Sequence, residues 1–230
     1  MHEQPVGILM LDTDFERLLG DAGNPKTWPF PVRIRKVKGA TVSAVVDKGA
    51  DGLARMFIDA GKALIREEAV SAITTTCGFL VVHQQALAEA LPVPVATSSL
   101  LQIPIVDSLL PKGKRTGVLT FDARGLNPAM LAAAGARADT PVVGLPPEGH
   151  FHRRIRENVQ PDLKALDAEV QDVTEGFLKQ RPEVGALVVE CANLPGYSAT
   201  LAERFGIPVY DLVTMVRWLK AAVTPPRYAA

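Results

Sequence analysis

The chain contains two cysteines, Cys77 and Cys191, which occupy equivalent places in two halves that repeat each other. The first half opens with VGILMLD at Val6–Asp12, and the second opens with TGVLTFD at Thr116–Asp122. Because the repeat returns a thiol to the same place, just past an apolar run, it predicts one pocket with a sulfur on each wall. The recurring residues are Gly7/Gly117, Leu9/Leu119 and Asp12/Asp122 at one constant offset, and Ala72/Ala186, Cys77/Cys191, Leu80/Leu194, Pro94/Pro208 and Val95/Val209 at a second.

Each thiol follows a predicted strand and precedes a predicted helix. Cys77 stands between AITTT and GFL, and Cys191 stands between LVVE and ANLP. In open α/β sheets this carboxyl edge is where ligands bind. Free backbone N–H groups and the helix dipole favour an anion there. The same field lowers the pKa of a thiol, so we expect an available thiolate. The alternative is a pair of buried, inert cysteines.

Two opposed thiols suit proton transfer at the carbon next to a carboxylate. One thiolate removes the proton as a base and the other thiol returns a proton on the opposite face as an acid. Donors around the carboxylate must stabilise the carbanion. The sequence shows no pyridoxal-type lysine motif, nucleotide-binding loop or metal-ligand spacing, so we expect chemistry without a cofactor or metal. The candidate donors are the hydroxyls of Thr75, Thr76 and Thr120, the Asn193 amide and the backbone N–H groups after each cysteine.

Short apolar runs alternate with segments of helical period, which is typical of an α/β protein with parallel sheets. We predict two pseudo-symmetric lobes from an internal duplication, each with a four-stranded parallel sheet flanked by helices, and a site in the cleft between them. The first lobe is residues 1–111 with 210–230, and the second is residues 112–209. The predicted strands are Val6–Leu11, Val32–Val37, Val70–Thr75, Val93–Ala96, Gly117–Phe121, Val142–Leu145, Ala186–Val189 and Ile207–Asp211.

Bulk composition narrows the class of protein. The chain has 230 residues, 25 basic and 25 acidic, so no net charge recruits nucleic acid or an anionic membrane surface. No apolar stretch is long enough to span a bilayer, and the N-terminus lacks the pattern of a signal peptide. We therefore expect a cytoplasmic protein whose partner is a small molecule.

The stretches TTTCGF at Thr74–Phe79 and VECANL at Val189–Leu194, within duplicated α/β halves, resemble the aspartate/glutamate racemase superfamily. That group includes hydantoin racemases, maleate isomerases and arylmalonate decarboxylases. The resemblance covers essentially the whole chain. It implies a site between two lobes with one cysteine from each, cofactor independence and often a homodimer or higher oligomer.

By position, the resemblance assigns Cys77 and Cys191 as the acid/base thiols. It assigns substrate binding to loops that include residues of both halves. These candidates are Asn24, Thr76, Gly78, Phe79, Thr120, Asn127, Ala192 and Asn193.

The chain departs from glutamate racemases after the second cysteine, where Ala192-Asn193 replaces the usual Thr-His. It also has Asp12-Thr13-Asp14 where those enzymes have Asp-Ser-Gly. The substrate is therefore left open. The first hypothesis is a two-cysteine racemase or isomerase acting on a small amino-acid-like carboxylate. The alternatives are a maleate-type cis–trans isomerase with a nucleophilic cysteine and a non-catalytic small-molecule-binding protein.

Glu190 and the stretch with His150 and His152 are interpreted as structural and not as catalytic. Glu190 is expected on the opposite face of its strand from Cys191, in a structural ion pair. The stretch PPEGHFHRR, with His150 and His152, is expected to be a solvated connection, although it could also cover the site.

Overall fold

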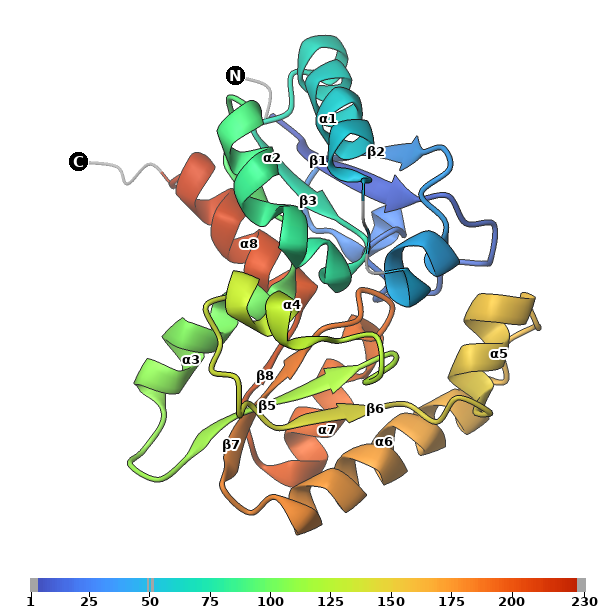
Figure 1. Cartoon of the computed structure of the whole chain (residues 1–230), viewed down its shortest axis with the longest axis vertical. Coiled ribbons are helices and arrows are strands. Elements are labelled where there is room, and N and C mark those ends of the chain that lie inside the picture. The colour runs from blue at the N-terminus through green and yellow to red at the C-terminus, as the bar shows by residue number, and fades with distance from the viewer. Residues whose placement is uncertain (1–3, 49, 51, 227–230) are drawn as a thin grey trace.

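A computed structural model describes residues 4–48, 50 and 52–226. Figure 1 shows two lobes, the first coloured blue to green and the second mostly yellow to orange. Each lobe holds a four-stranded sheet, ordered β2-β1-β3-β4 in the first and β6-β5-β7-β8 in the second, with all neighbours parallel. The predicted fold class is confirmed. The strands are β1 Val6–Leu11, β2 Val32–Val37, β3 Ala72–Thr75, β4 Val95–Ala96, β5 Arg115–Thr120, β6 Val142–Gly144, β7 Val184–Val189 and β8 Val209–Tyr210.

Helices cover both sheets, as parallel sheets require. The α-helices are α1 Ala54–Glu68, α2 Gln84–Ala90, α3 Ile103–Leu109, α4 Pro128–Ala133, α5 His150–Glu157, α6 Leu163–Gln180, α7 Ser198–Phe205 and α8 Leu212–Val223. Shorter helices are η1 Pro25–Thr27, η2 Ser43–Asp47, η3 Gly78–His83, η4 Ser99–Gln102 and η5 Pro195–Tyr197.

The duplicated glycines have a packing reason. A Cβ on Gly7 of β1 would lie 2.7 Å from Leu64 Cδ2 of α1, and one on Gly117 of β5 would lie 2.7 Å from Phe177 Cε1 of α6. Both distances are shorter than real Cβ contacts. Each central strand therefore needs glycine so that the long helix of its lobe can approach closely.

The C-terminal helix α8 packs on the first lobe, although it follows the second in the chain (Figure 1). Its Leu212, Met215 and Val216 are buried in one apolar cluster with Val6 and Ala72 of the first sheet. Asp211 caps the helix by accepting from the Thr214 N–H at 2.7 Å, and the Thr214 hydroxyl accepts from the Asp211 N–H. The lobe boundaries given above stay a prediction.

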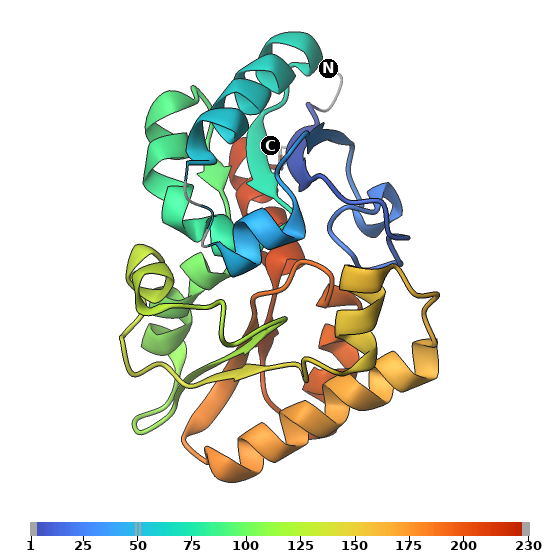
Figure 2. The same cartoon turned by 45° about the vertical axis from the view of Figure 1, so that its right-hand side comes forward.

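The segment around His152 is not a solvated connection, so that prediction is wrong. Residues 150–157 form α5, and His152 is 2% exposed. Its ring stacks on Phe121 at 4.0 Å between centroids, and its Nε2 lies 2.8 Å from the Phe121 carbonyl oxygen. In Figure 2, α5 rises from the second lobe toward the loops of the first. Aromatic stacking thus holds this stretch as a helix on the second lobe, and its Ile155 lines the pocket between the lobes.

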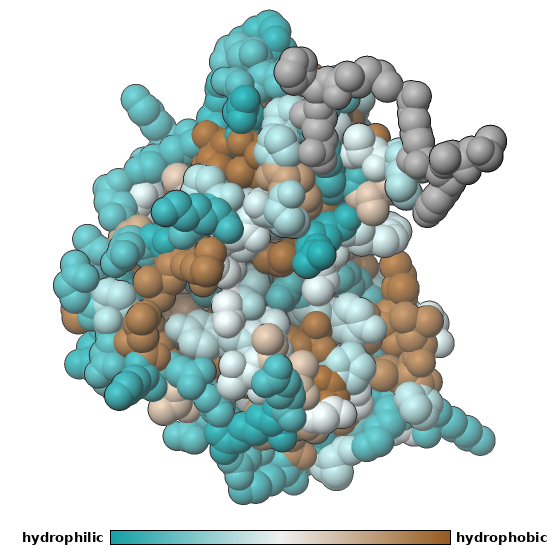
Figure 3. Space-filling model, turned by 180° about the vertical axis from the view of Figure 1, so that it is seen from behind, coloured by the Kyte–Doolittle hydropathy of each residue, from teal (hydrophilic) through white to brown (hydrophobic). Residues whose placement is uncertain are grey.

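Hydrophobic residues reach the surface at several separate places on the side opposite to Figure 1 (Figure 3). Exposed large apolar side chains of the described residues include Ile105 and Leu109 of α3 and Trp218 of α8. The expected homo-oligomer stays a prediction. No helix within the described ranges is long and apolar enough to cross a membrane.

Candidate active site

A pocket lies between the lobes, at the carboxyl ends of the central strands, and both cysteines line it. The first lobe supplies the loop after β1, η2 and the Cys77 loop. The second lobe supplies the loop after β5, α5 and the Cys191 loop. The lining residues are Leu11, Thr13, Phe15, Arg17, Val42, Val46, Thr76, Cys77, Gly78, Phe79, Phe121, Ile155, Glu190, Cys191, Ala192 and Asn193.

Cys77 immediately precedes η3 and is half-buried. The Thr75 hydroxyl donates to the Thr97 carbonyl oxygen at 2.7 Å, and the Thr76 hydroxyl accepts from the Leu11 N–H at 3.1 Å. These two bonds tie the strand end that carries the thiol to both neighbouring strands. Burial raises the pKa of Cys77 well above its usual range, and the Glu190 carboxylate raises it further. The Phe79 N–H and Arg17 act in the opposite direction.

Cys191 is buried, with 7% of its surface exposed. Its Sγ lies 3.6 Å from Asn193 Oδ1. Burial, Glu190 and Cys77 raise the pKa of this thiol as well. Both pKa directions are opposite to the lowered thiol pKa expected from the sequence, so that expectation is wrong. Desolvation outweighs the N–H groups and helix ends that favour a thiolate.

Glu190 is not in an ion pair on the far face, so that prediction is also wrong. The residue is 2% exposed and lines the pocket between the two cysteines. Its Oε2 accepts from the Thr120 hydroxyl at 2.7 Å, and backbone N–H groups of Phe121, Gly78 and Phe79 also donate to the carboxylate. The backbone donors after Cys77, expected to bind a substrate carboxylate, are thus satisfied by the protein's own carboxylate.

The buried Glu190 carboxyl gives a pH-dependence prediction. Burial raises its pKa from 4.5 to about 7, against the opposing effect of its hydrogen bonds. The native protein therefore holds this proton where the unfolded chain has released it, so the free energy of unfolding should fall as pH rises from 4.5 to 7. The expected fall due to this group is about 3 kcal/mol. Urea unfolding of the wild type and Glu190→Gln across this range measures it; equal slopes would contradict the assignment.

Gly78 is the contact point between the Cys77 loop and Glu190. A Cβ there would meet the Glu190 side-chain carboxylate and would lie 2.7 Å from its backbone carbonyl oxygen. We expect Gly78→Ala to destabilise the protein by about 1–3 kcal/mol, because the Glu190 backbone cannot give way. Gly176→Ala is the matched control, since a Cβ there meets nothing within 4 Å in helix α6. That control should be neutral or stabilising by up to about 1 kcal/mol in the same denaturant titration.

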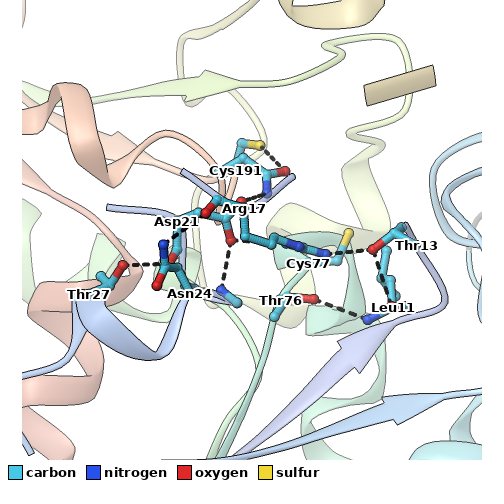
Figure 4. A network of polar contacts seen from close by, with 12 residues as sticks. Leu11, Thr13, Arg17, Asp21, Asn24, Thr27, Thr76, Cys77 and Cys191 are labelled. Carbon is cyan, nitrogen blue, oxygen red and sulfur yellow. Dashed lines mark hydrogen bonds and ion pairs between the residues drawn. The ribbon is translucent and has the colours of Figure 1, made fainter. Parts of the chain in front are cut away.

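Arg17, which was not among the candidates from the sequence, is the basic residue among the described pocket-lining residues. Its guanidinium donates to Asp21 Oδ1 at 3.0 Å and to the Thr13 hydroxyl at 2.7 Å, and it stacks over the Phe15 ring at 4.4 Å. Figure 4 shows this side chain extending past Cys77 toward Thr13. No periodic pattern marks Arg17, since it stands in an irregular loop after β1.

Three expected substrate-binding residues lie outside the pocket lining. Asn24 begins η1 and donates from Nδ2 to the Arg17 carbonyl oxygen at 2.8 Å, so it supports the Arg17 loop (Figure 4). Thr120 is fully buried against Glu190. Asn127 caps α4 by accepting from the Met130 N–H at 3.0 Å. The structure brings the other candidates to the pocket, namely Thr76, Cys77, Gly78, Phe79, Cys191, Ala192 and Asn193.

Solved structures with the same architecture include racemases and a decarboxylase. Allantoin racemase from Klebsiella pneumoniae superposes with a TM-score of 0.67 at 16% identity, covering 99% of this chain and 96% of that one. Arylmalonate decarboxylase gives a TM-score of 0.61 at 15% identity, with 97% and 95% covered. The chain shares its fold with this racemase and this decarboxylase, two kinds of enzyme that the sequence resemblance also pointed to. At these identities the superfamily likeness concerns the fold alone.

Sequence comparison adds a different set of relatives. The chain is 26% identical over 231 residues to a dimethylsulfoniopropionate lyase of Durusdinium sp. clade D, covering 97% of this chain and 76% of that protein. It is 26% identical over 241 residues to dimethylsulfoniopropionate lyase 7 of Emiliania huxleyi, covering 97% and 68%. No family model matches the chain.

Proposed function

We propose that this protein is a cofactor-independent enzyme that removes the proton next to the carboxylate of a small substrate and eliminates a β-substituent, with dimethylsulfoniopropionate as the substrate to test first. The observation that carries the proposal is the pocket itself, where two thiols and Arg17 meet within apolar and aromatic walls. The similarity to proteins named dimethylsulfoniopropionate lyases supports a sulfonium as the β-substituent that leaves. The superfamily fold supports carbanion chemistry.

The pocket suits a substrate with a carboxylate at one end and a methylated cation at the other. Arg17 offers N–H donors to the carboxylate. The rings of Phe15, Phe79 and Phe121 line the pocket and offer apolar contacts to the methyl groups of a sulfonium. Glu190 adds negative charge beside the thiols, and a bound cation offsets it. The substrate thereby lowers the pKa of the thiol that must act as base.

The reaction balances without a further reactant. A cysteine thiolate takes the proton from the carbon next to the carboxylate, and the electron pair of that C–H bond forms a carbon–carbon double bond. The bond from the β-carbon to sulfur breaks, and its electron pair leaves with sulfur. The products are neutral dimethyl sulfide and acrylate, and the thiol returns its proton to water.

Racemisation of an amino-acid-like carboxylate is the second candidate. The observation that favours it is the second thiol, because elimination requires a base but no acid on the other side. Both reactions begin with the same proton abstraction, and they differ in whether the carbanion loses a β-substituent or regains a proton.

The deciding experiment supplies the purified protein with dimethylsulfoniopropionate, and separately with amino acids, hydantoins and maleate, in deuterated water. Dimethyl sulfide in the headspace supports the lyase, and deuterium incorporation next to the carboxylate with loss of chirality supports the racemase. Fumarate from maleate, with a cysteine adduct in the mass spectrum, supports the isomerase. Binding without turnover or exchange of any of them overturns the proposal in favour of a binding protein.

A further inference from the structure

Asn193 lies between a buried carboxylate of the first lobe and the thiol of the second. Its Nδ2 donates to Asp21 Oδ2 at 2.5 Å, and its Oδ1 lies 3.6 Å from Cys191 Sγ. Asp21 is 1% exposed and does not line the pocket. A polar chain therefore runs from the loop after β1 to the second cysteine (Figure 4).

Asp21 fixes which way the Asn193 amide points. Its Oδ1 accepts from Arg17 at 3.0 Å and from the Gly23 N–H at 2.7 Å, and its Oδ2 accepts from Asn193, so both oxygens face donors. A carboxylate held in this way accepts hydrogen bonds and does not donate them. The NH₂ group of Asn193 must therefore face Asp21, and the amide oxygen must face the sulfur.

An oxygen acceptor beside a sulfur favours the thiol over the thiolate, because it stabilises S–H and repels S⁻. Among the described residues, no side-chain oxygen accepts a hydrogen bond from the Cys77 thiol, and the Arg17 guanidinium favours an anion at that sulfur. The two cysteines, which the repeat makes equivalent, thus have unequal surroundings.

We propose that Asp21 is a positioning residue that, through the Asn193 amide, holds Cys191 as the thiol and leaves Cys77 as the base. This assignment rests on the proposed function for its catalytic meaning, but the protonation asymmetry is measurable without turnover. Other charged groups also face Cys191: Glu190 on its own strand end, Cys77 across the pocket and Arg154 of α5. The Asn193 backbone N–H donates to the sulfur and acts against the amide oxygen.

The test is the pH dependence of Cys191 alkylation by iodoacetamide in a Cys77→Ser background, where one thiol remains. Asp21→Asn keeps the shape of the side chain. Its oxygen is expected to stay with Arg17 and Gly23 and its NH₂ to face Asn193, which must then rotate and turn its own NH₂ toward the sulfur. We expect the alkylation midpoint to fall by about one pH unit, which is about a tenfold faster reaction at a fixed pH below the midpoint.

Loss of the Asp21 charge also favours a thiolate, so the same change is made with Asn193→Ala present. In that background no side-chain amide is present at position 193. The fall in the alkylation midpoint caused by Asp21→Asn should therefore drop to less than half of its value with Asn193 present. An equal displacement in both backgrounds overturns the proposal, because Asp21 would then act through charge alone. Absence of a downward displacement in the first background overturns it as well.

If Asp21→Asn fails to fold by circular dichroism, Asn193→Ala alone removes the acceptor. A lower midpoint in that variant supports the proposal, and an unchanged midpoint overturns it. Failure of the proposed function is a separate result. If the wild-type protein shows neither lyase nor exchange activity, the proposed reaction is wrong. The alkylation midpoints still test whether Asp21 keeps Cys191 protonated.

Discussion

Replacement of Cys77 by alanine is expected to lower the rate of substrate elimination, and of hydrogen exchange next to the carboxylate, by at least about 10³-fold. General acid–base catalysis contributes about 10²–10⁴-fold. Alanine removes the base without filling its place, and the described pocket lining holds no histidine or lysine to replace it. Headspace detection of dimethyl sulfide and exchange in deuterated water measure the two activities on the same preparation.

Cys191→Ala is the matched variant, since it removes the equivalent thiol from the other wall. Elimination needs a base alone, so a lyase should lose less activity with Cys191→Ala than with Cys77→Ala. A racemase should lose racemisation with either change, because each direction requires both an acid and a base. Full activity of Cys77→Ala would show that this thiol is not the base.

Replacement of Arg17 by leucine is expected to lower kcat/KM by about 10²-fold. Loss of one partner from a buried charged hydrogen bond costs about 2–5 kcal/mol. The Arg17 side chain is 12% exposed and lines the pocket, so its charge is poorly screened by water. Most of the effect should appear in KM, because the guanidinium holds the carboxylate both before and during proton transfer.

Arg17→Lys should recover part of the activity, since it keeps the charge but loses the planar donors that also reach Asp21 and Thr13. Arg33→Leu is the control, because Arg33 pairs with Glu68 on the exposed outer edge of the first sheet. Denaturant unfolding of each variant separates loss of binding from loss of fold. An unchanged KM in a folded Arg17→Leu variant would contradict the carboxylate assignment.

The duplicated sheets were predictable because their signals are local. Apolar strand runs, the glycines required by close helix packing and the helix stripes each lie within a few neighbouring residues. The eight strand positions follow from these patterns, with ends that differ by one or two residues because fraying and hydrogen bonding decide where pairing stops. The repeat also predicted that both cysteines face one pocket, since equivalent strand ends of two packed lobes meet there.

The chemistry of the pocket depended on contacts between distant segments. Glu190 faces inward because the Thr120 hydroxyl, the Phe121 N–H and the two N–H groups after Cys77 present four donors, and no feature of the stretch LVVEC indicates this. Arg17 and Asp21 come from an irregular loop without period, yet that loop reaches Asn193 of the other lobe. The sequence by itself determined the lobes and the paired thiols. The tertiary structure alone decided the surroundings that raise the pKa of those thiols, because burial and cross-lobe neighbours set a pKa and neither is encoded in local spacing.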